Sequence, residues 1–183
     1  MQNSEQKAII TIVLADDHSL VRDGIRALLE EEPGLDVIGE VSNGLDALKM
    51  VDEKSPDILI IDIRMPELGG IETVERLNAK GKSNTKCIIL SMHDSEEYIL
   101  KSVQAGANGY LLKDTGKAEF VKAIHMVQEG GKYFSGDISN VLVNNLFSSD
   151  KKTNQSSSKA NKSTPFDLDR KSTRLNSSHL LIS

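Results

Sequence analysis

The residues of this sequence that could do chemistry stand directly behind short runs of aliphatic residues. AIITIVLA (8–15) runs into two aspartates, and DILIID (57–62) ends in a third. KCIILS (86–91) ends in a serine, and NGYLL (108–112) is followed by a lysine. The residues concerned are Asp16, Asp17, Asp62, Ser91 and Lys113. Three carboxylates, a hydroxyl and an ammonium group together can bind a small cation and a phosphoryl group.

The three carboxylates need a compensating charge if they lie together. Two carboxylates about 4 Å apart repel each other by roughly 4 kcal/mol at an effective dielectric constant of about 20. Three of them favour uptake of a proton or of a divalent cation, and ligation by oxygen with open water positions suits Mg²⁺. A carboxylate beside Mg²⁺ and a lysine can accept a phosphoryl group, because the positive charges neutralise the transferring oxygens. Asp62 is the candidate acceptor.

Alternating strands and helices must bring these side chains to one place. The four runs and LDVIGEV (35–41) are mostly continuous apolar stretches, which are typical of strands buried on both faces of a parallel sheet. Amphipathic segments lie between them, and in the first of these Val21, Ile25 and Leu28 recur at helical spacing. Five βα units in series predict a parallel sheet with helices on both faces. Side chains at the carboxyl ends of its strands meet at one edge.

Each of these residues also has a purely structural interpretation. Asp16 or Asp17 can cap the helix that follows, and Asp62 can form the turn behind its strand. Ser91 can cap a helix, and Lys113 can be a solvated loop lysine. Taken together these interpretations become weak, because independent caps have no reason to converge on one crevice.

Several motifs resemble the receiver domains of bacterial two-component response regulators. LADDHSLVRDGIRALL, ILIIDIRMP, GGIE, LSMHD and GANGYLLKD are similar to the NarL/FixJ branch with LuxR-type output, and the resemblance covers 8–130. It implies an α/β, flavodoxin-like (βα)5 fold, a doubly wound parallel sheet with strand order 2-1-3-4-5. It also implies a phosphorelay signalling domain rather than a conventional enzyme, one that assists only its own phosphorylation and dephosphorylation.

The resemblance implies how the acidic residues divide their work. Asp62 would be the phosphoacceptor, forming 4-aspartylphosphate with a phosphoryl group from the histidine of a sensor kinase. Asp17 would bind Mg²⁺ directly, and Asp16 would act mainly through water. Asp62 itself and the backbone carbonyl of Arg64 would complete the protein ligands.

The same resemblance assigns the residues around the phosphoryl group. Ser91 and Lys113 would contact its oxygens, and Tyr110 would be the switch aromatic that rotates inward behind Ser91 on phosphorylation. Two positions depart from the common pattern. Asp114 follows the lysine where many receivers have proline, and Met92 follows the serine where alanine or glycine is frequent.

Behind the receiver the composition changes. A short extra helix is expected at 131–147, and a flexible linker rich in Ser, Lys and Asn at 148–168. An unstructured tail is expected at 169–183. Its segment DRKSTRLNSSH (169–179) corresponds to one reading frame of a short-read sequencing adapter; a natural disordered tail is the alternative.

The expected partners follow from the branch that the motifs resemble. NarL-type regulators continue into a helix-turn-helix domain, so we expect transcription regulation by descent in a chain truncated before that domain. DNA would be bound only through the missing domain, and phosphorylation would produce a homodimer. The chain carries 22 Lys and Arg against 27 Asp and Glu, and 148–183 holds seven of these basic residues but only three acidic ones. The acidic body is therefore a poor DNA ligand by itself.

Composition and spacing limit the remaining possibilities. No apolar run approaches the roughly 18 residues that cross a membrane, and a secretory signal is not recognisable, so a cytoplasmic location is expected. Cys87 and the four histidines show no zinc-site spacing. A stand-alone receiver that acts through protein contacts is the alternative. A phosphohydrolase is disfavoured because Arg64 stands where its second acid belongs, and a flavin protein because bulky acids follow the first strand.

Overall fold

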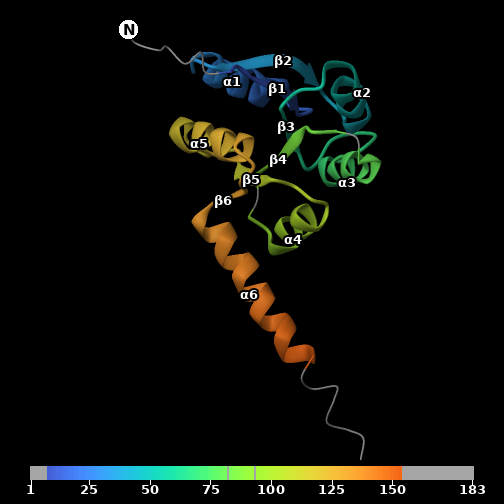
Figure 1. Ribbon diagram of the computed structural model, residues 1–183, viewed down its shortest axis with the longest axis vertical. Helices are drawn as coiled ribbons and strands as arrows, with labels where there is room; N and C mark the ends of the chain where they lie inside the picture. The colour runs from blue at the N-terminus through green and yellow to red at the C-terminus, as the bar shows by residue number, and fades with distance from the viewer. Residues whose placement is uncertain (1–7, 82, 93, 154–183) are drawn as a thin grey trace, which may run out of the picture.

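A parallel sheet of six strands forms the centre of the computed structural model, which describes residues 8–81, 83–92 and 94–153. The strand order is β2-β1-β3-β4-β5-β6, and helices cover both faces (Figure 1). The strands are β1 (Ile10–Ala15), β2 (Leu35–Val41), β3 (Ile58–Asp62), β4 (Lys86–Ser91), β5 (Gly109–Leu112) and β6 (Tyr133–Phe134). The helices are α1 (Ser19–Glu30), α2 (Gly44–Lys54), α3 (Gly70–Lys80), α4 (Glu96–Gln104), α5 (Lys117–Gln128) and α6 (Gly136–Thr153). The predicted fold and the order 2-1-3-4-5 are confirmed, with one strand more than expected.

Strand β3 shows why the sheet is covered on both faces. All of its residues are buried. Ile58 and Ile60 belong to an apolar cluster with α1 and α5, whereas Leu59 and Ile61 belong to a cluster with α2, α3 and α4, because successive side chains of a strand point to opposite faces. Each fully buried aliphatic side chain contributes roughly 1.5–3 kcal/mol. The apolar run therefore fixes a central strand, and Asp62 comes at its end.

The helices are amphipathic, as their sequence spacing predicts. Helix α5 buries Phe120, Ile124 and Val127 against the sheet. Helix α2 begins after Asn43, whose side chain accepts a hydrogen bond from the backbone N–H of Asp46 over 2.8 Å and so satisfies one donor of the first turn. Within the described ranges, none of the helices is both long and apolar enough to cross a bilayer.

The segment after α5 differs from the expectation. Strand β6 runs parallel to β5, and the backbone N–H of Tyr133 donates to the carbonyl of Asn108 over 2.9 Å. A strand of two residues is too short to show a periodic pattern in the sequence. The helix expected at 131–147 is α6, which begins later and continues into the predicted linker (148–168). The rest of that linker and the predicted tail, residues 154–183, lie outside the described residues.

Candidate functional site

The acidic residues predicted from the sequence meet at the carboxyl ends of β1 and β3. These strands are neighbours in the sheet, so the residues that follow them lie side by side. Asp16, Asp17, His18 and Asp62 each place one possible ligand atom within 4.8 Å of the others. Asp16 and Asp62 are buried, and Asp17 and His18 are exposed. Three carboxylates and an imidazole on one rim are a donor set that fits a divalent cation.

Lys113 brings a positive charge to the buried pair of carboxylates. Its ammonium nitrogen lies 2.9 Å from Oδ2 of Asp62 and 2.7 Å from Oδ2 of Asp16, and its side chain is only 4% exposed. The ammonium group donates a hydrogen bond to Asp62 and forms an ion pair with Asp16. Burial lowers the pKa of Lys113, but the two carboxylates outweigh it and raise the pKa overall. The lysine is therefore a fixed cation.

Asp62 is held in an environment that disfavours its negative charge. Burial is the largest influence and raises the pKa of its carboxyl group. The bond from Lys113 and the backbone N–H of Arg64 lower it, while the neighbouring Asp16 raises it further. The net result is a pKa above the ordinary 3.8. One lysine does not compensate two buried carboxylates, and an added cation would relieve the remaining imbalance.

Ser91 completes the site from β4, the next strand of the sheet. It is buried, and it lines a small cleft of about 60 Å³ together with Asp62 and Lys113. His18, Ile63, Arg64, Met92 and Tyr98 line the rest of this cleft. The cleft has room for a group of a few atoms beside Asp62.

Tyr110 lies behind Ser91 on strand β5. The tyrosine is fully buried at 0% exposure, and its side chain is hydrogen-bonded to that of Ser91. Burial raises the pKa of its phenol, and the bond to Ser91 opposes this. The described position of Tyr110 is the inward one that the sequence resemblance associates with the phosphorylated state. The ligand role predicted for the carbonyl of Arg64 stays a prediction.

Two contributors to the site have no role in the sequence predictions. His18 Nδ1 lies 2.9 Å from Oδ1 of Asp17 and 3.3 Å from Oδ1 of Asp16, and the His18 backbone N–H donates to that same oxygen of Asp16. The predicted helix cap by Asp16 is not formed, because the N-cap of α1 is His18 and Asp16 accepts only from the backbone of that cap residue. Gly70 packs against the backbone of Asp62, where an added Cβ would lie 2.1 Å from the carbonyl oxygen. The motifs DDH and GGIE contain these residues, but the chain sequence shows neither contact.

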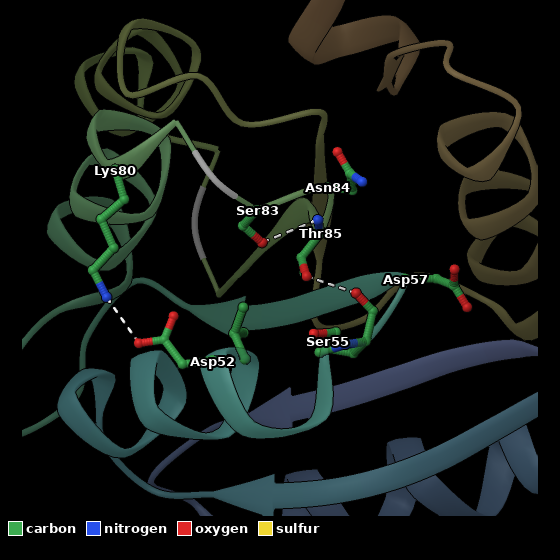
Figure 2. A pocket seen from close by; sticks show the side chains of 9 residues that line it. Asp52, Ser55, Asp57, Lys80, Ser83, Asn84 and Thr85 are labelled. Carbon is green, nitrogen blue, oxygen red and sulfur yellow. Dashed lines mark hydrogen bonds and ion pairs between the residues drawn. The ribbon is translucent and has the colours of Figure 1, made fainter.

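A larger cleft, of about 380 Å³, lies at the opposite edge of the sheet between α2, α3 and the start of β4 (Figure 2). Its charged side chains Lys80 and Asp52 form an ion pair of 2.9 Å with each other. The hydroxyl of Thr85 donates to the carbonyl of Pro56, and the Asp57 carboxylate points away from the opening. Because these polar groups satisfy one another, size alone does not make this cleft a reactive site. The small cleft at Asp62 remains the candidate.

The comparisons with known proteins agree with the geometry. A family described as "Response regulator receiver domain" matches residues 12–125. Response regulator UvrY of Escherichia coli (strain K12) is 38% identical over 135 residues, covering 74% of this chain and 62% of that protein. Nitrate/nitrite response regulator protein NarL of the same organism is 34% identical over 136 residues, with the same two coverages.

Solved structures give the same result. The crystal structure of a LuxR-family two-component response regulator from Aurantimonas sp. SI85-9A1 superposes with a TM-score of 0.71 at 33% identity. The match covers 76% of this chain and 99% of that one. Against the curated relatives, in contrast, the chain spans about three fifths of their length.

Proposed function

Because the chain belongs to the response regulator receiver domain family, in the branch of NarL and LuxR-family regulators, we propose that Asp62 accepts a phosphoryl group and so switches the domain. The observation that supports this most strongly is the placement of Asp62. Its carboxylate ends a central strand, contacts Lys113 over 2.9 Å and shares a 4.8 Å cluster with three further possible ligands. A signalling domain of this kind needs little more than position and charge to react.

The transfer is a displacement at phosphorus. A carboxylate oxygen of Asp62 forms a new bond to phosphorus while the bond from phosphorus to a histidine nitrogen of the donor breaks. The histidine leaves with the electron pair of that bond. Lys113, already beside Asp62, neutralises charge on the transferring oxygens, and the hydroxyl of Ser91 donates to one of them. The raised pKa of Asp62 favours a reaction that replaces a poorly solvated carboxylate with an anion bound by Lys113.

The acidic cluster is proposed as the Mg²⁺ site that this reaction requires. Asp17 would bind the ion directly and Asp16 through water, with Asp62 and the carbonyl of Arg64 as the other protein ligands. Asp16 is buried and belongs to the 4.8 Å cluster, and its Oδ2 already pairs with Lys113 over 2.7 Å, which fits a carboxylate that would reach the cation through water. When bound, Mg²⁺ would neutralise charge on the phosphoryl oxygens.

The partners are part of the proposal. A sensor histidine kinase would supply the phosphoryl group, and phosphorylation would promote a homodimer. Relatives are named as transcriptional regulatory proteins, and a DNA complex of two RcsB dimers is among the similar structures. We infer control of transcription as the output, with DNA bound by a part of the protein other than the acidic receiver. A cytoplasmic location is proposed with it.

Small phosphodonors test the proposal directly. Acetyl phosphate with Mg²⁺ should add a single acid-labile phosphoryl group to the full chain, measured by intact mass. Asp62→Asn should take up none, and Asp57→Asn, at the other end of the same strand, should be labelled normally. Chelation of Mg²⁺ should abolish labelling. Equal labelling of Asp62→Asn would refute the assignment.

A further inference from the structure

The loop between β1 and α1 carries two of the proposed magnesium ligands, Asp16 and Asp17. The backbone N–H of Asp16 donates to the carbonyl of Val41 over 3.1 Å. This bond continues the pairing of β1 with β2 by one residue, since Ala15 and Val41 are partners in that pairing. The carbonyl of Asp16 comes after this last bond, and the residue is only 2% exposed. A buried carbonyl at a strand end needs a donor, because leaving it unpaired costs free energy.

Arg22, in the first turns of α1, supplies that donor. Its Nη1 donates to the carbonyl oxygen of Asp16 over 2.6 Å, and its Nε donates to Oε1 of Glu40 over 3.1 Å. Glu40 lies on β2 as the partner of Leu14, close to the end of β1. The side chains of Arg22 and Glu40 are only 19% and 20% exposed. One planar guanidinium group therefore ties the loop to the neighbouring strand.

The bond from Arg22 orients more than one oxygen atom. The carbonyl of Asp16 belongs to the peptide group that joins Asp16 to Asp17, and a peptide group is planar. Holding this carbonyl therefore also directs the N–Cα bond of Asp17, the residue proposed to bind the cation directly. On the side-chain end of the same loop, Oδ1 of Asp16 accepts from the backbone N–H of His18 over 2.8 Å. The backbone and the carboxylate of Asp16 are thus held by different donors.

The charge of Arg22 is balanced away from the acidic cluster. A positive charge beside the site would by itself repel a cation, but Glu40 pairs with Arg22 and offsets it. Glu40 also pairs with Arg26, which lies one turn farther along α1 and forms a second ion pair of 2.7 Å with Glu30. Arg26 thus shares the helix and the glutamate with Arg22, but its partners lie outside the loop. It is a matched control for Arg22.

We propose that Arg22 is a positioning residue of the cation site, which holds the peptide group between Asp16 and Asp17 so that their carboxylates are directed at the ion. The inference rests on the Mg²⁺ site proposed above. Its sign separates it from a simple charge effect. Removing the bond would free the peptide group and weaken cation binding, because ligands that are ordered beforehand lose less entropy on binding. Removing a positive charge would by itself strengthen cation binding.

Calorimetric titration of the full chain with MgCl₂, without a phosphodonor, tests this role. Arg22→Gln should raise the dissociation constant on the order of tenfold, because groups that orient metal ligands have effects of this size. Arg22→Lys keeps the charge, but one ammonium group on a flexible stem does not reproduce the planar fork, so its binding should also be weaker. Arg26→Gln should bind Mg²⁺ like the wild type.

A cooperative thermal transition reports whether each variant is folded, and Arg22→Lys carries the test if Arg22→Gln does not fold. Unchanged or tighter binding in a folded Arg22→Gln or Arg22→Lys would overturn the role of Arg22. Equal weakening in Arg26→Gln would overturn it as well, since that variant leaves the bond to Asp16 in place.

The Mg²⁺ concentration that gives half the maximal labelling rate separates positioning of the ion from the reaction itself. With acetyl phosphate, this concentration should rise in Arg22→Gln by the same factor as the dissociation constant, while the rate at saturating Mg²⁺ stays near that of the wild type. A lower saturating rate with an unchanged half-maximal concentration would contradict a positioning role. A wild-type chain that binds Mg²⁺ but is not labelled would refute the phosphoacceptor function and leave the role of Arg22 intact.

Discussion

The two ends of strand β3 carry the same side chain in opposite circumstances. Asp57 precedes the strand, and Asp62 ends it. Burial raises the pKa of both carboxyl groups. At Asp57 the backbone and side chain of Thr11 donate over 2.8 and 2.7 Å, and Gln128 and Lys86 help, so that the pKa falls below its ordinary value. At Asp62 the bonds to Lys113 and to the backbone of Arg64 do not outweigh burial and Asp16.

This difference separates a carboxylate that stabilises the fold from one that is kept reactive. The carboxylate of Asp57 accepts from donors on β1 and α5, and it points away from the opening of the cleft drawn in Figure 2. The carboxylate of Asp62, in contrast, is shielded from water by burial and lies next to a lysine and further acids. A buried carboxylate with a raised pKa beside a fixed cation is typical of a functional site. A carboxylate whose oxygens are all used by hydrogen-bond donors is typical of a structural site.

The largest effect is expected from removing the cation at the carboxyl end. Lys113→Met keeps the length and apolar stem of the side chain but deletes its charge, which is the only positive charge within ion-pair distance of Asp62 among the described residues. Labelling by acetyl phosphate should become slower on the order of a hundredfold. Lys117→Met is the control, because Lys117 pairs with Glu31 on the surface. Equal labelling rates in the two variants would remove the distinction between the ends of β3.

A pair of substitutions tests the structural role of Asp57 and the reactive role of Asp62 separately. Asp57→Ala strands the N–H and hydroxyl of Thr11, so the free energy of unfolding should fall by about 1–3 kcal/mol, with labelling intact. Asp62→Asn should abolish labelling and leave the fold at least as stable, because it removes a charge that the fold disfavours. Denaturant unfolding and intact mass measure both quantities. Destabilisation by Asp62→Asn as large as that by Asp57→Ala would contradict the comparison.

The backbone behind Asp62 should be sensitive to added volume. Gly70→Ala places a methyl group 2.1 Å from the Asp62 carbonyl oxygen, so the strand end must shift. We expect a loss of about 1–3 kcal/mol in unfolding free energy together with slower labelling. Gly24→Ala in α1 has open space around it and should be neutral or slightly stabilising. A Gly70→Ala protein that is labelled at the normal rate would show that the strand end is not held in place by this contact.

The smallest effect is a difference in pH dependence. Asp57 has a lowered folded pKa, so its contribution to stability is complete above the ordinary value of 3.8 and is lost as the pH falls through the folded pKa. Asp62 has a raised folded pKa, so its ionisation costs stability near neutral pH, and the cost disappears as the pH falls through that pKa. The stability gain of Asp62→Asn should therefore shrink in mild acid before the loss in Asp57→Ala does. Unfolding curves across this range would measure the order, and the reverse order would contradict the assignment.

Much of the fold and of the site follows from the sequence by local reasoning. The apolar run 58–61 has to be buried on both faces, which requires a central parallel strand and places Asp62 at the strand end. The same reasoning applies to Ser91, which ends its strand, and to Asp16 and Lys113, which follow theirs. Their meeting at one edge is a consequence of parallel strands, so it could be expected without coordinates.

Other features depend on partners far away in the chain. The donors of Asp57 stand 46 and 71 positions from it, and nothing near Asp57 in the sequence distinguishes it from a turn-forming aspartate. The contact of Gly70 with the Asp62 backbone and the addition of β6 to the sheet are likewise tertiary facts. The sequence alone determined which strands are buried and which side chains end them, because the burial of a strand follows from the pattern of residues adjacent in the chain. Only the tertiary structure decided which carboxylate is saturated with donors and which is left in need of a cation, because that balance depends on groups brought together by folding.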